Sequence, residues 1–288
     1  MIPKVIHYCW FGGNKLPELG EQCIASWKKY CPEYQIIEWN ETNYDCLQSV
    51  YACEAYEEKK WAFISDYARL DIVYRYGGIY LDIDVELVQN LDSVINCSCF
   101  LATETTRMIG TGLGFGAEAG NINIKLMLDQ YKDIHFKLGK ELVDMLPCPH
   151  RNTLPFRRMG FEASDRIQYI NGAVIYPAEY FCPLDYETKQ LNITDNTVSI
   201  HHYNASWITE EEIELKKKVN EYRKQHGRIR TIIYKNICEY QMENRRVKIS
   251  LIVYFFWKKI QRRRNRANQN LKEECRSWQY AESDERKL

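Results

Sequence analysis

The stretch that decides the fold reads Gly77-Gly78-Ile79-Tyr80-Leu81-Asp82-Ile83-Asp84-Val85-Glu86. Apolar and polar residues alternate along it, which is the period-2 pattern of a β-strand whose successive side chains point to opposite faces. The apolar face must be buried in a sheet, whereas the other face carries Asp82 and Asp84 one pleat apart. The stretch therefore predicts a buried strand with two carboxylates pointing into the same space.

Two carboxylates this close repel each other and raise each other's pKa unless a cation lies between them. A divalent metal that prefers hard oxygen ligands, Mg²⁺ or Mn²⁺, would remove the repulsion and also bind the phosphates of a nucleotide. An edge strand with a solvated acidic face is the alternative, because Asp-x-Asp is common by chance. The spacing alone leaves both interpretations open.

A short helix is predicted immediately before this strand, over 65–76. Ser65 is a favourable N-cap residue, and Gly77 is a typical residue after the last helical turn. Asp66 and Arg69 are three residues apart and therefore share one helix face. They form either a solvated ion pair of little energetic value or a carboxylate for sugar hydroxyls beside a guanidinium for a phosphate.

Strands and helices alternate over the first 90 residues, which implies βαβ units and a mostly parallel sheet. Before the acidic strand we expect a strand over 4–11, a helix over 19–30, a strand over 34–39 and a helix over 43–61. Ligands of such sheets bind beyond the carboxyl ends of the strands. Trp10 and Phe11, which end the first strand, should therefore share one sheet edge with Asp82 and Asp84.

Further elements are predicted after the acidic strand. They are a strand over 99–103, a helix over 121–137 and a hairpin over 168–176 about the turn Asn171-Gly172. The glycine-rich run 110–117 nominally fits a dinucleotide fingerprint, but it lacks the required upstream strand and matching acidic residue. A flexible loop that faces a ligand is the favoured interpretation of that run.

Charge is distributed unevenly along the 288 residues, although 39 basic and 39 acidic residues balance overall. The segment 245–266 holds nine Lys/Arg and no Asp/Glu, which leaves 30 basic against 39 acidic residues in the remainder. A nucleic-acid binder needs positive charge across its working face, so nucleic acid is not an expected partner.

An apolar run over 249–257 lies inside this basic segment. It is too short for a membrane span, which needs about 20 residues. Its basic flanks predict an interfacial helix that rests on an anionic membrane surface, and a helix packed on the body of the protein is the alternative.

The 11 cysteines are odd in number and contain no C-x-x-C pair, so reduced thiols in a cytosolic protein are expected. The N-terminus enters a strand at once and offers no apolar signal region. We therefore expect a cytoplasmic protein, peripheral at the inner face of the plasma membrane. Its three parts would be a domain over 1–210, a helical basic extension over 211–266 and a polar tail over 267–288.

Several motifs together resemble glycosyltransferase family 32, a group of DXD-containing sugar transferases that includes capsular polysaccharide enzymes. The resemblance covers about residues 1–207 and rests on Ile2-Pro3-Lys4-Val5-Ile6-His7-x-x-Trp10-x-Gly12, Ser26-Trp27, Pro32, Trp39, Ser65-Asp66-x-x-Arg69, Tyr76-Gly77-Gly78-Ile79-Tyr80-Leu81-Asp82-Ile83-Asp84, His201/His202 and Ser206-Trp207. It implies a GT-A-like, Rossmann-like fold with helices flanking the sheet and a C-terminal helical extension outside it.

The resemblance also implies roles for individual residues. Trp10 would stack on the donor base, with His7 and Phe11 shaping that pocket. Asp66 and Arg69, with Ser65 in the same motif, would contact the donor sugar and phosphate.

The remaining implied roles concern the metal and the leaving group. Asp82 would reach the ribose and sugar, and Asp84 would ligate the metal. His202 or Asn204, with Ser206, would complete the metal side, and Trp207 would donate its indole N–H to the departing phosphate. Which of the two adjacent histidines faces the site is left open.

The predicted activity is that of a retaining, metal-dependent hexosyltransferase. It would move a sugar from a UDP- or GDP-sugar to a growing surface or capsular glycan, carried on a polyprenyl diphosphate. A metal-dependent nucleotide-sugar hydrolase and a non-enzymatic carbohydrate-binding protein are the alternatives. The sugar, the linkage and the oligomeric state do not follow from the sequence.

Overall fold

The computed structural model describes residues 1–139, 143–186, 188–204, 218–219 and 221–222. The chain divides into two units, Met1–Trp207 and Ile208–Leu288, and nearly all described residues lie in the first. The predicted domain boundaries, the basic helix around the apolar run 249–257 and the polar tail lie outside the described residues and stay predictions. Among the described helices, none combines the length and the apolar composition that a membrane span requires.

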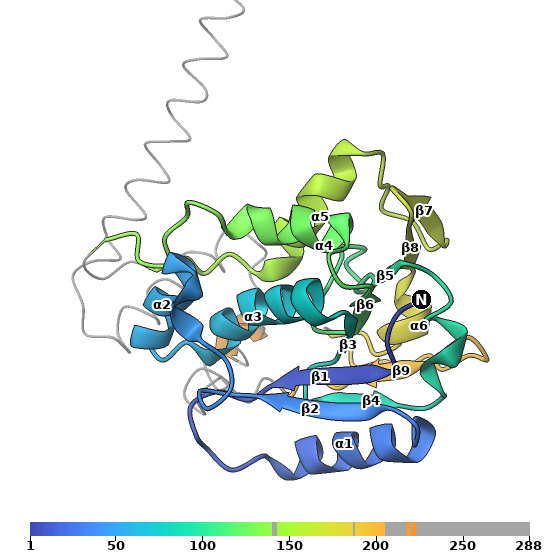
Figure 1. The fold of residues 1–288 in the computed structure, drawn as a ribbon. Helices are drawn as coiled ribbons and strands as arrows, with labels where there is room; N and C mark the ends of the chain where they lie inside the picture. The colour runs from blue at the N-terminus through green and yellow to red at the C-terminus, as the bar shows by residue number, and fades with distance from the viewer. Residues whose placement is uncertain (140–142, 187, 205–217, 220, 223–288) are drawn as a thin grey trace, which may run out of the picture. The chain divides into compact units, whose positions relative to one another are not determined.

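A seven-stranded sheet with the order β2-β1-β3-β6-β5-β8-β7 forms the middle of the first unit (Figure 1). Its strands are β1 (Val5–Cys9), β2 (Gln35–Trp39), β3 (Gly78–Tyr80), β5 (Cys99–Ala102), β6 (Phe115–Ala117), β7 (Gln168–Ile170) and β8 (Ala173–Tyr176). Five of these strands run in one direction, whereas β6 and β7 run in the other. The predicted α/β class with a mostly parallel sheet is confirmed.

Helices cover both faces of this sheet (Figure 1). They are α1 (Glu18–Tyr30) and α6 (Ala178–Phe181) on one face, and α2 (Val50–Glu57), α3 (Trp61–Tyr76), α4 (Ile122–Leu128) and α5 (Cys148–Arg158) on the other. Successive strand residues enter opposite cores: Ile79 packs on the α1 side and Tyr80 on the α3 side. Trp27 fixes α1, because its ring is fully buried and its Nε1 donates to the carbonyl oxygen of Val85 at 2.7 Å. Burial of such a side chain contributes roughly 1.5–3 kcal/mol.

The acidic strand predicted over 77–86 is interrupted by a turn, which corrects the expectation of one continuous strand. The amide of Val85 donates to the carbonyl oxygen of Asp82 at 3.0 Å and closes this turn. The chain then leaves the large sheet as β4 (Val85–Leu87), which pairs antiparallel with β9 (Ser199–His201). The apolar side of the pattern nevertheless stays buried on both sides of the turn, at Ile79, Leu81, Ile83, Val85 and Leu87.

Three predicted helices differ from the observed ones. Helix α3 begins four residues before Ser65, so this residue is not a cap, and its hydroxyl donates to the carbonyl oxygen of Trp61. The helix predicted over 43–61 is a 3₁₀ turn, η1 (Cys46–Gln48), followed by α2. The helix predicted over 121–137 ends with α4 and a second 3₁₀ turn, η3 (Asp129–Tyr131); a third, η2 (Leu91–Ser93), precedes β5.

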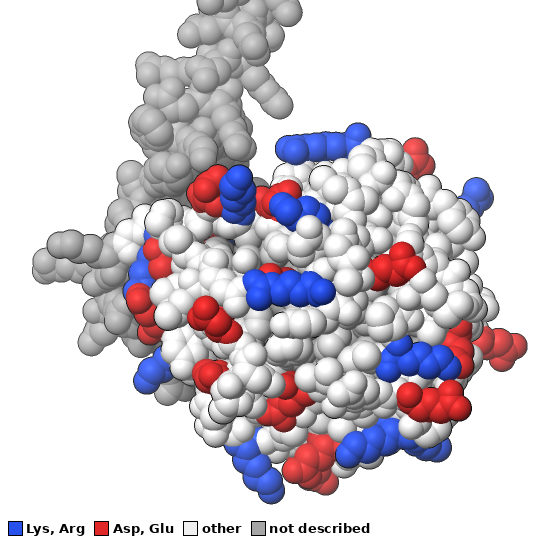
Figure 2. All heavy atoms as spheres, in the orientation of Figure 1, with Lys and Arg blue, Asp and Glu red and all other residues white. Residues whose placement is uncertain are grey.

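The hairpin between β7 and β8 is confirmed. Asn171 and Gly172 both have positive φ, 50° and 77°, as a tight two-residue hairpin turn requires. Basic and acidic side chains are interspersed on the face shown in Figure 2, so no basic stripe crosses the described part of that face.

Candidate active site

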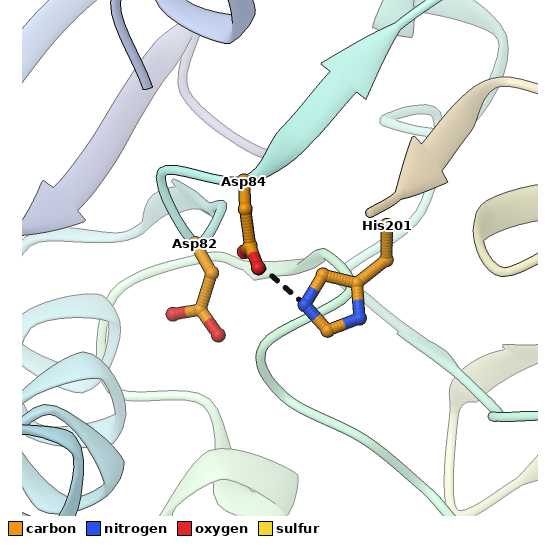
Figure 3. A group of neighbouring side chains, drawn as sticks. All are labelled: Asp82, Asp84 and His201. Carbon is orange, nitrogen blue, oxygen red and sulfur yellow. Dashed lines mark ion pairs between the residues drawn. The ribbon is translucent and has the colours of Figure 1, made fainter. Parts of the chain in front are cut away.

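Three potential metal ligands meet at the turn between β3 and β4 (Figure 3). Asp82 and Asp84 belong to this turn, and His201 ends β9, where it lies opposite Val85 in the antiparallel register. One ligand atom from each lies within 4.8 Å of the others, and Nε2 of His201 is 3.2 Å from Oδ1 of Asp84. The pairing of β4 with β9 therefore brings together residues that are more than 100 positions apart.

The charges within this cluster perturb one another. Burial alone would raise the pKa of Asp84, but the neighbouring His201 and the backbone amide of Asn204 lower it to about 2. Burial raises the pKa of Asp82 against the opposing effect of Arg69. Burial would lower the pKa of His201, yet Asp84 and Asp82 raise it above its usual value.

The donor set fits a divalent metal. Two carboxylates and one imidazole are ligands that Mn²⁺ accepts, and carboxylates also suit Mg²⁺. Nδ1 of His201 is buried and has no hydrogen-bond partner among the described residues. A buried polar atom without a partner is unusual. The nitrogen that faces Asp84 is Nε2, which would be the ligand atom at this cluster.

A second charged group joins α3 to the same turn. Arg69 is only 4% exposed, and its guanidinium contacts Asp66 at 2.7 Å and Asp82 at 3.4 Å. Its Nε donates to the carbonyl oxygen of Ser65, and the ring of Tyr80 lies 5.1 Å below the guanidinium carbon. The alternative of a solvated surface ion pair is therefore wrong. A buried ion pair is weak evidence of stabilisation, which favours a functional role for this one.

The glycine-rich run that precedes β6 is buried, which corrects the expectation of a flexible loop. The carbonyl oxygen of Gly112 accepts a hydrogen bond from the amide of Asp82 at 3.1 Å. A Cβ atom at Gly112 would lie 2.2 Å from Oδ2 of Asp82 and 3.0 Å from Nη1 of Arg69. The bare backbone of Gly112 thus makes room for the acidic cluster. The only sequence signal for this role was its place in the glycine run.

The N-terminal motif is mostly structural. His7 is buried, its Nδ1 accepts from Nε1 of Trp39 at 3.1 Å, and its Nε2 is 2.9 Å from the carbonyl oxygen of Gly77. Since Nδ1 is an acceptor, Nε2 carries the proton and donates it to Gly77. Phe11 is buried and packs near Tyr44. The role of His7 and Phe11 in shaping a base pocket stays a prediction, and with this packing they would act from buried positions.

Trp10 is partly exposed, and its Nε1 donates to the carbonyl oxygen of Asn14 at 2.6 Å. An open pocket of about 660 Å³ lies beside the segment that follows Trp10. Its lining consists of Gly12, Gly13, Asn14, Glu41, Tyr56, Lys59 and Trp61. Tyr56 and Trp61 offer ring surfaces there that the sequence pattern did not single out.

The histidine in the acidic cluster is His201, which corrects the predicted ligand His202. Nε2 of His202 instead lies 2.9 Å from Oε2 of Glu86 on β4. Asn204 approaches Asp84 through its backbone amide, at 2.8 Å from Oδ2. Ser206 and Trp207 lie outside the described residues, so their predicted roles stay predictions.

The sequence of residues 17–101 matches the family model described as "Glycosyltransferase sugar-binding region containing DXD motif". That segment contains Asp66, Arg69, Asp82 and Asp84, and the resemblance inferred from the motifs is confirmed. Residues 17–101 are thus similar to this sugar-binding region.

Two relatives from Schizosaccharomyces pombe are similar to part of the chain. Inositol phosphoceramide mannosyltransferase 1 is 29% identical over 115 residues, which are 36% of this chain and 34% of the relative. Inositol phosphoceramide mannosyltransferase 3 is 31% identical over 103 residues, which are 33% and 28% of the two chains. The chain thus spans about a third of the length of the curated relatives that it matches.

Two solved structures are also similar. The PaToxG glycosyltransferase has a TM-score of 0.43 and 20% identity, covering 55% of this chain and 68% of its own. A glycosyltransferase involved in glycosylation of the major capsid of PBCV-1 has a TM-score of 0.42 and 12% identity, covering 71% and 95%. Both TM-scores are below 0.5, so these are distant likenesses.

Proposed function

We propose that this chain is a metal-dependent, retaining hexosyltransferase that moves a sugar from a UDP- or GDP-sugar to a glycan acceptor. One observation carries the proposal. Asp82, Asp84 and His201 converge beside the buried Asp66–Arg69 pair, and all of these except His201 lie in the matched glycosyltransferase region. This combination supports a donor site for a nucleoside diphosphate and a divalent metal.

Each group has a chemical task in this scheme. Asp82, Asp84 and His201 would hold Mn²⁺ or Mg²⁺, and the bound metal would neutralise charge on the departing diphosphate. Arg69 is fixed between Asp66 and Asp82, which orients a permanently charged guanidinium for a donor phosphate. The second oxygen of Asp66 would accept a hydrogen bond from a donor-sugar hydroxyl.

We infer same-face attack by the acceptor, with a phosphate oxygen taking the proton of the attacking hydroxyl. The two-carboxylate scheme of glycosidases does not apply, because Asp82 and Asp84 serve the donor. Capture of a covalent glycosyl-enzyme by mass spectrometry would contradict this mechanism.

The acceptor is proposed to be a glycan on a membrane lipid, of the polyprenyl-diphosphate type that serves capsular and other surface polysaccharides. The basic segment 245–266 supports this, and the two curated relatives are named for mannose transfer to inositol phosphoceramide. The protein would then be cytoplasmic and peripheral at the inner face of the plasma membrane. Flotation of the full chain with phosphatidylglycerol vesicles, but not with neutral vesicles, is expected; equal behaviour with both would contradict the membrane proposal.

A panel of nucleotide sugars tests the proposed activity. Melting temperature is measured with UDP-, GDP- and CMP-sugars, including a mannose donor, with and without Mn²⁺. A shift that requires both nucleotide sugar and metal is expected, and its absence across the panel would contradict the donor site. Product analysis then separates transfer from hydrolysis, and binding without turnover would instead favour a carbohydrate-binding protein.

A further inference from the structure

A third acidic side chain, Glu104, lies at the same edge of the sheet as the metal-ligand cluster. Glu104 comes two residues after β5, and β5 runs in the same direction as β3, with only β6 between them. Ligands bind beyond the carboxyl ends of parallel strands, so Glu104 and Asp82 both follow strands at the ligand-binding edge. The sequence analysis did not single out Glu104.

The turn that carries Glu104 is tightly fixed. Its backbone amide donates to Met108 at 2.9 Å, its carbonyl oxygen accepts from Arg107 at 2.8 Å, and Arg107 has a positive φ of 61°. Helix α5 holds the segment that follows this turn, because the amide of Ile109 donates to Oγ1 of Thr153 at 2.9 Å. A Cβ atom at Gly110 would lie 3.0 Å from Cγ of Glu104, so the side chain lies across a bare glycine. The position of this carboxylate is therefore built into the fold.

The carboxylate of Glu104 has bonding capacity left. Its Oε2 accepts a hydrogen bond from Thr106 at 3.0 Å, and no described residue donates to its Oε1. Burial raises the pKa of Glu104, whereas His201 and His150 oppose that effect. Its charge in turn raises the pKa of His201 and that of Cys148.

The buried glycine run locates Glu104 beside the site. Glu104 lies against Gly110, and Gly112, two residues further on, contacts Asp82 through its backbone, so Glu104 is close to the donor cluster. It forms no ion pair with Arg69 and is not one of the three clustered metal ligands. A fixed carboxylate that lies beside the donor cluster, but is not part of it, is placed to contact the acceptor substrate.

We propose that Glu104 forms the acceptor side of the site, where Oε1 accepts a hydrogen bond from an acceptor hydroxyl that neighbours the attacking one, whose own proton goes to the phosphate oxygen. The ligand class is a hydroxyl-bearing acceptor, with water as its smallest member. This inference rests on the proposed glycosyl transfer. The competing role is a simple turn cap, as at Glu179, whose Oε1 accepts from Thr194 and Asn196.

The test compares Glu104→Gln with Glu179→Gln and Thr106→Ala in the full-length protein. Release of nucleotide from the best donor of the panel is measured with Mn²⁺, and nucleoside diphosphate affinity is measured by calorimetry. Glu104→Gln should lower turnover on the order of 10- to 100-fold, the value of a hydrogen bond to a charged group. Nucleotide affinity and melting temperature should stay close to wild type, and the two control variants should keep their turnover.

Unchanged turnover in Glu104→Gln would overturn the inference, as would an equal loss in Thr106→Ala, which would reveal a turn cap. A parallel loss of nucleotide affinity would place Glu104 on the donor side and overturn it too. If the wild-type protein released no nucleotide from any donor of the panel, the proposed function itself would fail and take this inference with it. An inactive wild-type protein would thus contradict the proposed function, whereas an active wild-type protein with an equally active Glu104→Gln variant would contradict only the role of Glu104.

Discussion

The ends of β1 and β3 are neighbours in the sheet, and both carry motifs that resemble those of sugar transferases, yet the protein uses them differently. After β3, each carboxylate oxygen of Asp82 and Asp84 makes one contact within the protein and keeps a second lone pair for a ligand, and both carboxylates lie beside Nε2 of His201. On β1, both ring nitrogens of His7 are bonded within the protein. A polar side chain is available to a ligand only when its own fold has not used its bonding capacity. Remaining bonding capacity therefore distinguishes residues that can bind a ligand from residues that only support the fold, even where their sequence motifs look alike.

The comparison predicts its largest effect at Asp84. Asp84→Ala should lower metal-dependent turnover on the order of 100-fold or more, as loss of a group that stabilises transition-state charge does. Its melting temperature should also fall, because the carboxylate accepts from the amide of Asn204 and pairs with His201, so turnover is compared at a temperature at which both proteins are folded. Turnover is measured against Mn²⁺ concentration, with Asp92→Ala as control, since Asp92 is hydrogen-bonded to Tyr34 and Lys4 elsewhere. Undiminished turnover and metal dependence in Asp84→Ala would remove the basis of the proposed donor site.

Gly112 should give the next largest effect. In Gly112→Ala the new methyl group would overlap Oδ2 of Asp82, since its Cβ would lie 2.2 Å away. Gly112 supports a metal-site residue, and a change in such a support that displaces the ligand should lower metal affinity about 10- to 100-fold. Gly139→Ala is the matched control, because nothing lies within 4 Å of a Cβ atom there. Equal metal affinities in calorimetry would show that the cluster adapts and that Gly112 does not position it.

The two histidines of the last motif should differ in metal binding. His201→Ala removes a clustered nitrogen and should lower Mn²⁺ affinity about 10-fold or more. His202→Ala removes only the contact with Glu86, so its Mn²⁺ affinity should stay within about twofold of wild type, as for a partly exposed ion pair. Mn²⁺ titration followed by electron paramagnetic resonance distinguishes them, and a larger loss in His202→Ala would restore the original ligand assignment.

Local sequence patterns were sufficient for part of this site. The three-residue spacing of Asp66 and Arg69 placed them on one helix face, and they do form an ion pair. The alternation through 79–87 identified the residues that are buried on the α1 side, because both β3 and β4 keep the same period, but it did not identify Tyr80, which is buried on the α3 side. Gly77 ended the preceding helix as predicted, with a φ of 67°.

The rest depends on contacts between distant segments. Whether the stretch continues as one strand or turns at Asp84 depends on β9, which is more than 100 residues away in sequence. The register of that pairing sets His201, and not His202, opposite Val85, and one residue of slip would exchange them. The burial of His7 likewise follows from its bonds to Trp39 and Gly77, which come from two other elements.

The smallest effect on donor binding is expected at His7, where the effect on stability should be clear. His7→Phe leaves the N–H of Trp39 and the carbonyl oxygen of Gly77 unpaired. Each unpaired group should lower the free energy of unfolding by about 1–3 kcal/mol, measured by chemical denaturation. Nucleotide affinity should stay near wild type, whereas Trp10→Ala, which alters a partly exposed ring, should weaken it. Loss of nucleotide affinity in a folded His7→Phe variant would return His7 to the donor pocket.

The same residue gives a pH test of the comparison. Burial lowers the pKa of His7 below its ordinary value of 6.5, so the folded protein favours the neutral ring. Below pH 6.5 the unfolded chain binds the proton more readily than the folded one, and stability must fall as pH falls. His7→Phe lacks this titration, so its stability deficit relative to wild type should shrink between about pH 7 and pH 5. A constant deficit would mean that folding does not lower the pKa of His7. A deficit that grows as pH falls would mean that the folded protein favours the charged ring, whose Nδ1 could not accept from Nε1 of Trp39.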